Sequence, residues 1–290
     1  MKTESINKKY ARESFNRAAI TYDNVAVLQR EIGRRLIERL DIIRAVPQNI
    51  LDVGCGTGDN TMLLRKLYKR ASIVALDFAD QMINVANSKQ SWTDKLLKNE
   101  IRFVCADAEN LPFADNSFEF IYSNLTLQWC SDLDHTFSEF KRVLKPDGLL
   151  FFSTLGPDTL RELRHSWQQI DNNQHVHKFV DMHDIGDAMI RAGLADPVMD
   201  MEYFTLTYDS VMNLMRELKQ LGAHNASDNR PHHLTGKKHL RAMQQNYEQY
   251  RKDNKLPATY EVVYGHAWSV GINKSLTGNT DSINVQFTRR

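Results

Sequence analysis

Cysteine is scarce in this sequence, which has three thiols, Cys55, Cys105 and Cys130, among 290 residues. Three thiols cannot pair into a disulfide framework, and their spacing does not match a zinc site, so we expect reduced cysteines and no metal. No apolar run approaches the ~18 residues of a membrane-spanning helix. The amino terminus is polar and lacks the apolar core of a signal peptide. We therefore expect a cytoplasmic protein that does not enter a membrane.

A charge excess of one sign is also missing. The chain has 37 lysines and arginines against 36 aspartates and glutamates, which gives a formal net charge of +1. This balance supplies no overall attraction to nucleic acid or to a membrane surface, so neither is an expected partner. The length fits one α/β domain with insertions as well as two domains.

The most informative stretch is a glycine-rich turn between a short apolar strand and a helical pattern. Asp52 lies within the apolar run, Gly54, Gly56 and Gly58 follow at alternate positions, and residues 60–68 have helical spacing. Glycines allow positive φ angles and a close approach of the backbone to a ligand. A strand, a glycine turn and a helix are typical of nucleotide-binding sites. The spacing matches neither a phosphate loop nor a G-x-G-x-x-G dinucleotide fingerprint.

A second apolar run, at 72–77, ends in Asp77, about 20 residues after the glycines, where a carboxylate accepts hydrogen bonds from a ribose diol. Helical patterns, clearest at 60–68 and 182–192, alternate with the apolar runs, and this alternation predicts a parallel sheet with helices on both faces. The remaining strands are expected at 101–105, 117–124, 149–154, 197–207 and 261–268.

The D-x-G-x-G-x-G form at Asp52–Gly58 resembles motif I of the class I methyltransferases, which bind S-adenosylmethionine (SAM). Asp77–Met82, Ala106–Phe113 and Arg142–Gly148 are similar to later motifs of that family, in the same order. The resemblance implies a Rossmann-like α/β fold with a seven-stranded, mostly parallel sheet and helical lid insertions. It also implies SAM as cofactor, bound by Asp52, Gly54, Gly56, Gly58, Asp77, Phe78, Met82, Asp107, Ala108, Asn124 and Gln128.

Motifs outside this core resemble a narrower group, the malonyl-acyl carrier protein O-methyltransferases of biotin synthesis. The matching stretches are S-F-N-R-A-A-x-x-Y-D at 14–23, S-N-L-x-L-Q-W-C at 123–130 and L-P-A-T-Y-E-V-V-Y-G-H-A-W at 256–268. This resemblance implies methylation of the free carboxylate of a malonyl thioester, on acyl carrier protein or on coenzyme A. Ala79 replaces a serine and Asp147 replaces a glycine of the family pattern.

The organisation that follows has three parts. Residues 1–45 are expected to form a helical lid, and 46–268 a methyltransferase domain with helical insertions at about 156–180 and 209–255. The polar stretch at 269–290 has little pattern and is expected to be disordered.

The acceptor chemistry can be argued from general principles. A carboxylate is ionised at pH 7, so no general base is needed, and the enzyme must position an oxygen and exclude water. An arginine suits this task, and Arg161 and Arg164 share one side of a helix. The resemblance implies that Tyr22 lies near the acceptor, where it would assist by hydrogen bonding, with Gln29 as a weaker candidate. His183 is the candidate base if carbon is methylated.

Two other hypotheses stay open. One is a different small acceptor, such as a quinone precursor, which predicts activity without a carrier protein. The other is a methyltransferase-like factor that assembles respiratory complex I, which predicts protein binding and no ester formation. Phe15 and Trp129 fit either plain core packing or a place in the site.

Overall fold

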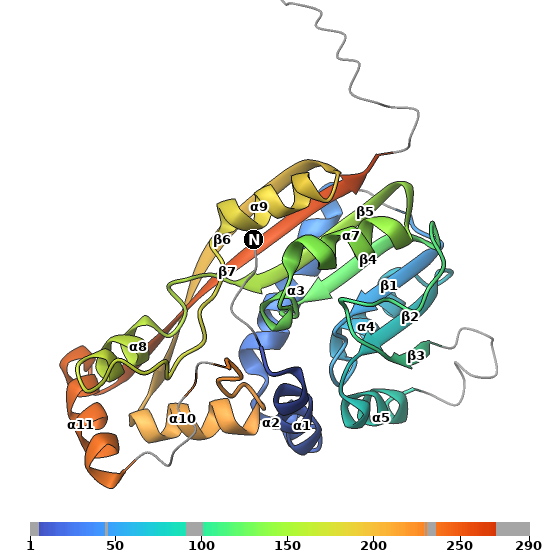
Figure 1. Cartoon of the computed structure of the whole chain (residues 1–290). Helices are drawn as coiled ribbons and strands as arrows, with labels where there is room; N and C mark the ends of the chain where they lie inside the picture. The colour runs from blue at the N-terminus through green and yellow to red at the C-terminus, as the bar shows by residue number, and fades with distance from the viewer. Residues whose placement is uncertain (1–5, 44–45, 91–100, 229, 231–235, 271–290) are drawn as a thin grey trace, which may run out of the picture.

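The computed structural model describes residues 6–43, 46–90, 101–228, 230 and 236–270. Within them, a seven-stranded sheet has the order β3-β2-β1-β4-β5-β7-β6 and forms the centre of the molecule (Figure 1). The strands are β1 (Asn49–Val53), β2 (Ser72–Asp77), β3 (Arg102–Cys105), β4 (Phe118–Asn124), β5 (Leu144–Leu155), β6 (Leu194–Tyr208) and β7 (Leu256–Ser269).

Most neighbouring strands of this sheet are parallel. β1 pairs in parallel with β2 and β4, β2 with β3, and β4 with β5. β7 runs antiparallel to both β5 and β6. The predicted seven-stranded, mostly parallel sheet is confirmed.

The last three strands are longer than their sequence patterns predict. β6 is buried only at its ends, Leu194 and Tyr208, and alternates half-buried and exposed positions between them. Charged residues such as Asp200 and Glu202 interrupt its apolar pattern. β6 and β7 nevertheless pair from Leu194 to Tyr208, with one irregularity between Ala195 and Val198. Beyond the end of β5 they continue as a two-stranded ribbon toward the lower left of Figure 1. Backbone pairing therefore sets the length of these strands.

Helices cover both faces of the sheet, as expected for strands with apolar residues on both sides. On one face, α3 (Val27–Ile43) and α4 (Asp59–Leu67) pack through residues such as Ile32, Leu36 and Leu64. On the other face lie α7 (Leu133–Val143) and α9 (Met182–Arg191). The helices predicted over 60–68 and 182–192 are thus confirmed to within one residue at each end.

The remaining helices gather toward the carboxyl ends of the parallel strands, where α/β proteins bind ligands. They are α1 (Lys8–Ala18), α2 (Tyr22–Val25), α5 (Asp80–Ser88), α8 (Arg161–Gln168), α10 (Val211–Gln220) and α11 (Lys237–Tyr247). Figure 1 shows α1, α2 and α10 together on the lower side of the molecule. The expected disordered tail lies outside the described residues, apart from positions 269 and 270. No helix of the described residues is both long enough and apolar enough to cross a bilayer.

Candidate active site

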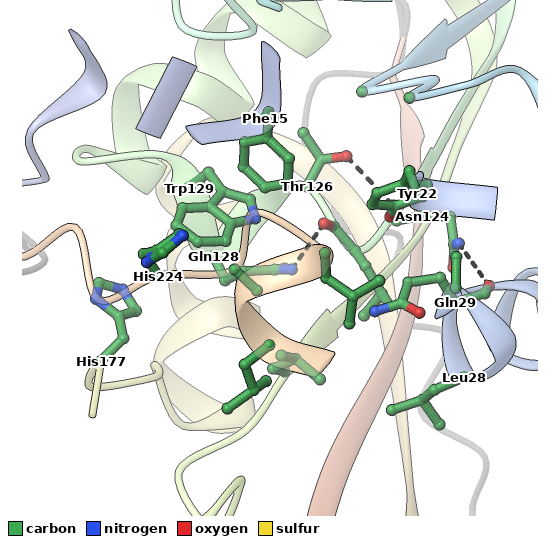
Figure 2. Close-up of a pocket in the computed structure, with 18 of the residues that line it drawn as sticks. Phe15, Tyr22, Leu28, Gln29, Asn124, Thr126, Gln128, Trp129, His177 and His224 are labelled. Atoms are coloured by element: carbon green, nitrogen blue, oxygen red, sulfur yellow. Dashed lines mark hydrogen bonds between the residues drawn. The ribbon is translucent and has the colours of Figure 1, made fainter. Parts of the chain in front are cut away.

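A cavity of about 460 Å³ lies at the carboxyl ends of the central strands. Its walls come from the turns after β1, β2, β3 and β4, and its cover comes from the amino-terminal helices, α8 and α10. Figure 2 shows part of this cavity, with Tyr22, Gln29 and Asn124 on one side and Trp129, His177 and His224 on the other. The predicted site residues that line it are Tyr22, Gly54, Gly56, Asp77, Phe78, Met82, Asp107, Ala108, Asn124 and Gln128.

The glycine turn gives the cavity its floor, and two glycines are needed for different reasons. Gly54 has φ +73°, and a Cβ there would lie 1.9 Å from Oγ1 of Thr126. Gly56 has φ +53°, and a Cβ there would meet no atom within 4 Å. Since Gly56 lines the cavity, that open space is part of the cavity. The turn therefore fits a cofactor that lies directly against the backbone.

Asp77 ends β2 and is the buried carboxylate of the cavity wall. Its oxygens accept hydrogen bonds from the backbone N–H of Gly56 at 2.9 Å and of Ala79 at 2.8 Å. Burial raises the pKa of Asp77 to about 6, against the effect of these backbone donors. A carboxylate has about four acceptor positions, so Asp77 retains capacity for the hydroxyls of a ribose.

Asp52 and Gly58 do not line the cavity, although both were expected to contact the cofactor. Asp52 is 1% exposed and accepts a hydrogen bond of 2.5 Å from Oγ1 of Thr61, at the start of α4. Burial raises the pKa of Asp52 to about 7. Gly58 precedes α4 and packs against Ala86 of α5. Both residues therefore pack on the side of the glycine turn that faces away from the cavity.

The opposite end of the predicted cofactor site is covered by α1. Met82 is buried on α5, and Asp107 and Ala108 follow β3. Nζ of Lys8 lies 2.6 Å from Oδ2 of Asp107. The ring of Phe15 packs edge-on against Phe78 and Trp129, at centroid distances of 5.8 and 5.0 Å. Phe15 and Trp129 therefore both contribute to the site.

The side-chain amides of Asn124, at the end of β4, and Gln128, after it, form hydrogen bonds with other protein groups. Asn124 donates to the carbonyl oxygen of Gln29 at 3.1 Å and accepts from Ser153 at 2.7 Å. Gln128 donates to the carbonyl oxygen of Leu125 at 2.7 Å and accepts from Thr154 at 3.2 Å. Oε1 of Gln29 is buried in the cavity wall and has no hydrogen-bond partner. Of these three amides, that of Gln29 is the one with a buried oxygen left without a partner.

Tyr22 lies on α2 and faces the same region of the cavity (Figure 2). Burial raises the pKa of its phenol, and the charges of Asp77, Asp23 and Asp59 raise it further. The hydroxyl therefore stays protonated at neutral pH, which suits a hydrogen-bond donor and does not suit a base.

The structure does not bring Arg161, Arg164 or His183 to this cavity. The side chain of Arg161 is 55% exposed and pairs with Asp158. Arg164 is turned to the carbonyl oxygens of Pro157 and Thr159, at 2.7 and 2.8 Å. The His183 side chain, 81% exposed, bonds Asp181 at the start of α9. The sequence pattern predicts that both arginines lie on one side of a helix, but it does not predict which side of that helix faces the cavity.

Several cavity residues carried no sequence motif that would assign them a role. Arg30 lines the cavity near the glycine turn and donates from Nη1 to the carbonyl oxygen of Asp23 at 2.6 Å. His177 stacks on Trp129 with ring centroids 6.3 Å apart. His224 and Lys219 come from the end of α10 and the loop after it. Within the described residues, no group of three or more side chains is arranged to hold a metal ion.

Comparison with known proteins gives a consistent result. The family model described as "Methyltransferase domain" matches residues 51–152. A malonyl-[acyl-carrier protein] O-methyltransferase of Methylovorus sp. (strain MP688) is 51% identical over 264 residues, covering 91% of this chain and 89% of that protein. The protein of the same name from Gallionella capsiferriformans (strain ES-2) is 51% identical over 91% of both chains. Among solved structures, the YcgJ protein of Bacillus subtilis has a TM-score of 0.56 at 18% identity, covering 81% of this chain and 98% of that chain, and shares the fold.

Proposed function

The chain belongs to the malonyl-[acyl-carrier protein] O-methyltransferase family, and we propose from this that it methylates the free carboxylate of malonyl-acyl carrier protein with SAM. The main support is the 51% identity over 91% of the chain, which extends far beyond the cofactor-binding core. The product is the malonyl methyl ester that primes the pimeloyl chain of biotin. The quinone-precursor and assembly-factor alternatives gain no support from the site or from the relatives.

We assign the cofactor to the part of the cavity between the glycine turn and Asp107. The open space at Gly56 supports a close backbone contact, and Asp77 supports binding of a ribose. Phe78 and Met82 offer apolar contact, while Asp107 and the Ala108 amide offer polar contact to an adenine. SAM supplies an activated methyl group when bound. Arg30, near the glycine turn, is a cation suited to the cofactor's own carboxylate.

The acceptor carboxylate belongs beside Tyr22 and Gln29 in this proposal. The carboxylate is already ionised at neutral pH, so these residues need only orient it and leave one oxygen lone pair free. The protonated hydroxyl of Tyr22 donates one hydrogen bond. The amide of Gln29 donates another when it is turned so that Nε2 takes the place of the unpartnered Oε1. The cover over the cavity excludes water from the reacting groups.

The helices of residues 1–45, with the insertions at 156–180 and 209–255, serve as that cover in our proposal. Phe15 and Tyr22 from the first segment, Leu163 from the second and Leu218 from the third all line the cavity. Acyl carrier protein as the carrier and a cytoplasmic location belong to the same proposal. The balanced net charge supports the absence of a nucleic-acid partner.

A methyl-transfer assay tests the function directly. Purified protein and SAM with a labelled methyl group are incubated with malonyl-acyl carrier protein, malonyl-coenzyme A or acetyl-acyl carrier protein. We expect base-labile label on the malonyl forms alone, because acetyl groups have no free carboxylate. A protein that binds SAM but labels no malonyl form would contradict the proposal.

A further inference from the structure

The covering helix α1 and the end of α10 meet at one side of the cavity. A Cβ at Gly222 would lie 3.0 Å from the carbonyl oxygen of Ser14 and 3.1 Å from Cα of Phe15. Gly222 has φ +71°, so both its conformation and this close approach favour glycine. The contact fixes the loop after α10 against α1 and brings the residues on either side of it together.

Two cations flank this contact. Arg17 lies three residues after Ser14 on α1, and its Nη2 donates to Oγ of Ser14 at 3.2 Å. Lys219 lies three residues before Gly222, and its carbonyl oxygen accepts from the N–H of Gly222 at 3.1 Å. Lys219 lines the cavity, whereas Arg17 lies outside its lining, and both side chains are exposed.

Both cations also act on the same cavity residue. Burial lowers the pKa of His224, and the positive charges of Arg17 and Lys219 lower it further. His224 itself lines the cavity, close to Trp129 and His177 in Figure 2. Arg17 and Lys219 therefore place two positive charges close to this cavity residue.

No carboxylate balances this charge within the part of the chain that the structure describes. Lys8, which also lines the cavity, is by contrast paired with Asp107, and Arg30 donates to the carbonyl oxygen of Asp23 and is assigned above to the cofactor's carboxylate. The hydrogen bond of Arg17 is to a hydroxyl, which leaves its charge uncompensated. An anionic group of a ligand would supply the missing partner.

We propose that Arg17 and Lys219 bind the phosphate of the phosphopantetheine arm that carries the malonyl group. This inference rests on the proposed function. The substrate has an anionic carboxylate at its inner end and a phosphate where the arm joins the carrier protein. The carboxylate must reach the methyl group inside the cavity, while the phosphate stays at the surface with the protein. Exposed cations beside the cavity match the phosphate, and Arg offers it paired donors.

Two soluble substrates that differ only in this phosphate provide the test: malonyl-phosphopantetheine and malonyl-pantetheine. We expect the wild-type protein to favour the phosphorylated arm by about tenfold in kcat/KM, the effect of one charge-assisted hydrogen bond. In Arg17→Gln/Lys219→Gln, the two values should converge, and kcat/KM for malonyl-acyl carrier protein should fall by a similar factor. Calorimetric titration with phosphopantetheine and pantetheine should show the same loss of preference without turnover.

A matched control removes two charges elsewhere. Lys69 and Arg70 are exposed and precede the amino end of β2, opposite the cavity. Lys69→Gln/Arg70→Gln should keep the tenfold preference, and Lys219→Arg should keep it as well, since the charge remains. Thermal melts check that each variant is folded.

Three results would overturn the inference. The wild-type protein could show the same kcat/KM with and without the phosphate, or the Arg17/Lys219 variant could lose kcat/KM equally on both substrates. The Lys69/Arg70 control could also reduce the preference as much as the Arg17/Lys219 variant does. Equal losses on both substrates would instead place the malonyl carboxylate beside Arg17 and Lys219. Failure of the proposed function is distinct, because the wild-type protein would then label neither arm nor malonyl-acyl carrier protein.

Discussion

Lys8 and Asp107 are 99 positions apart in the sequence, yet Nζ of Lys8 lies 2.7 and 2.6 Å from the two carboxylate oxygens of Asp107. The same ammonium pairs with Glu109. This contact ties the amino-terminal helix to the loop after β3. Since a carboxylate accepts several hydrogen bonds, Asp107 can hold Lys8 and an adenine amino group at once. In the proposed binding mode, the position of α1 and the binding of the cofactor are therefore coupled through the side chain of Asp107.

Lys8→Gln should weaken SAM binding because it loosens α1 over the cofactor. The pair is partly exposed, and such pairs contribute up to about 1 kcal/mol, which corresponds to about a fivefold rise in the dissociation constant. Calorimetric titration with SAM measures the change. Lys9 is exposed on the same helix, so Lys9→Gln serves as the control and should leave the affinity unchanged. Equal effects of the two variants would show that α1 is not tied through Lys8.

Alanine at Gly54 and at Gly56 should separate folding from cofactor binding. A Cβ at Gly54 would overlap Thr126, so Gly54→Ala should lower the melting temperature markedly. Gly56→Ala meets open space and costs the folded protein only about 1 kcal/mol of backbone strain. We nevertheless expect Gly56→Ala to lose SAM binding, since its methyl group occupies the cofactor's space. Thermal melts with and without SAM distinguish the two. If SAM raises the melting temperature of Gly56→Ala as much as that of the wild type, the cofactor lies elsewhere.

The sequence predicts the fold and the cofactor side of this site because both depend on local patterns. Apolar runs mark the strands, and glycines at alternate positions mark the turn that they must form. Asp77 follows directly because it ends a strand. Strand ends of a parallel sheet meet at one edge, so their residues converge whatever the details of packing.

The acceptor side depends on how insertions are rotated and docked, which no local pattern encodes. Arg161 and Arg164 satisfy the chemical requirement, but α8 turns its apolar face, with Leu163 and Trp167, into the cavity. Lys219 lies in a segment without a motif and reaches the cavity through the contact of Gly222 with α1. Long-range packing of this kind appears only in three dimensions.

Tyr22→Phe tests the role of the phenol as a donor. Loss of one hydrogen bond to an anionic acceptor should lower kcat by about tenfold while the SAM dissociation constant changes little. Because the raised pKa keeps Tyr22 protonated, the kcat–pH profile of the variant should have the same shape as that of the wild type up to pH 9. A wild-type kcat that rises with pH, and a variant that lacks this rise, would instead identify Tyr22 as a base. Single-turnover rates with bound SAM are the appropriate measurement.

SAM affinity should depend on pH through Asp77, whose pKa is raised to about 6 by burial. Ribose hydroxyls donate to the ionised carboxylate, so affinity should be constant above pH 7 and fall by up to tenfold per unit below pH 6. Stability of the free protein has the opposite trend. A carboxyl with a raised pKa binds protons more tightly when folded, so its contribution to stability grows as the pH falls from about 6 toward its ordinary value of 3.8.

Asp77→Asn is the control for this titration. It should bind SAM weakly at all pH values and show no affinity change centred at pH 6. Calorimetric titrations from pH 5 to 8 follow the affinity, and urea melts without SAM follow the stability. A wild-type affinity that is flat from pH 5 to 8 would contradict the assignment of Asp77 to the ribose.

Arg161 and Arg164 should affect stability and not acceptor binding, contrary to what their spacing suggests. Arg164 donates to the carbonyl oxygens of Pro157 and Thr159, so Arg164→Met should lower the free energy of unfolding by about 1–3 kcal/mol. Arg161 is exposed and paired with Asp158 at 3.3 Å, so Arg161→Ala should cost less than about 1 kcal/mol. Both folded variants should keep the wild-type KM for malonyl-acyl carrier protein, because neither side chain lines the cavity. A tenfold rise in KM for either variant, with its melting temperature unchanged, would return that arginine to the acceptor site and require α8 to rotate when substrate binds.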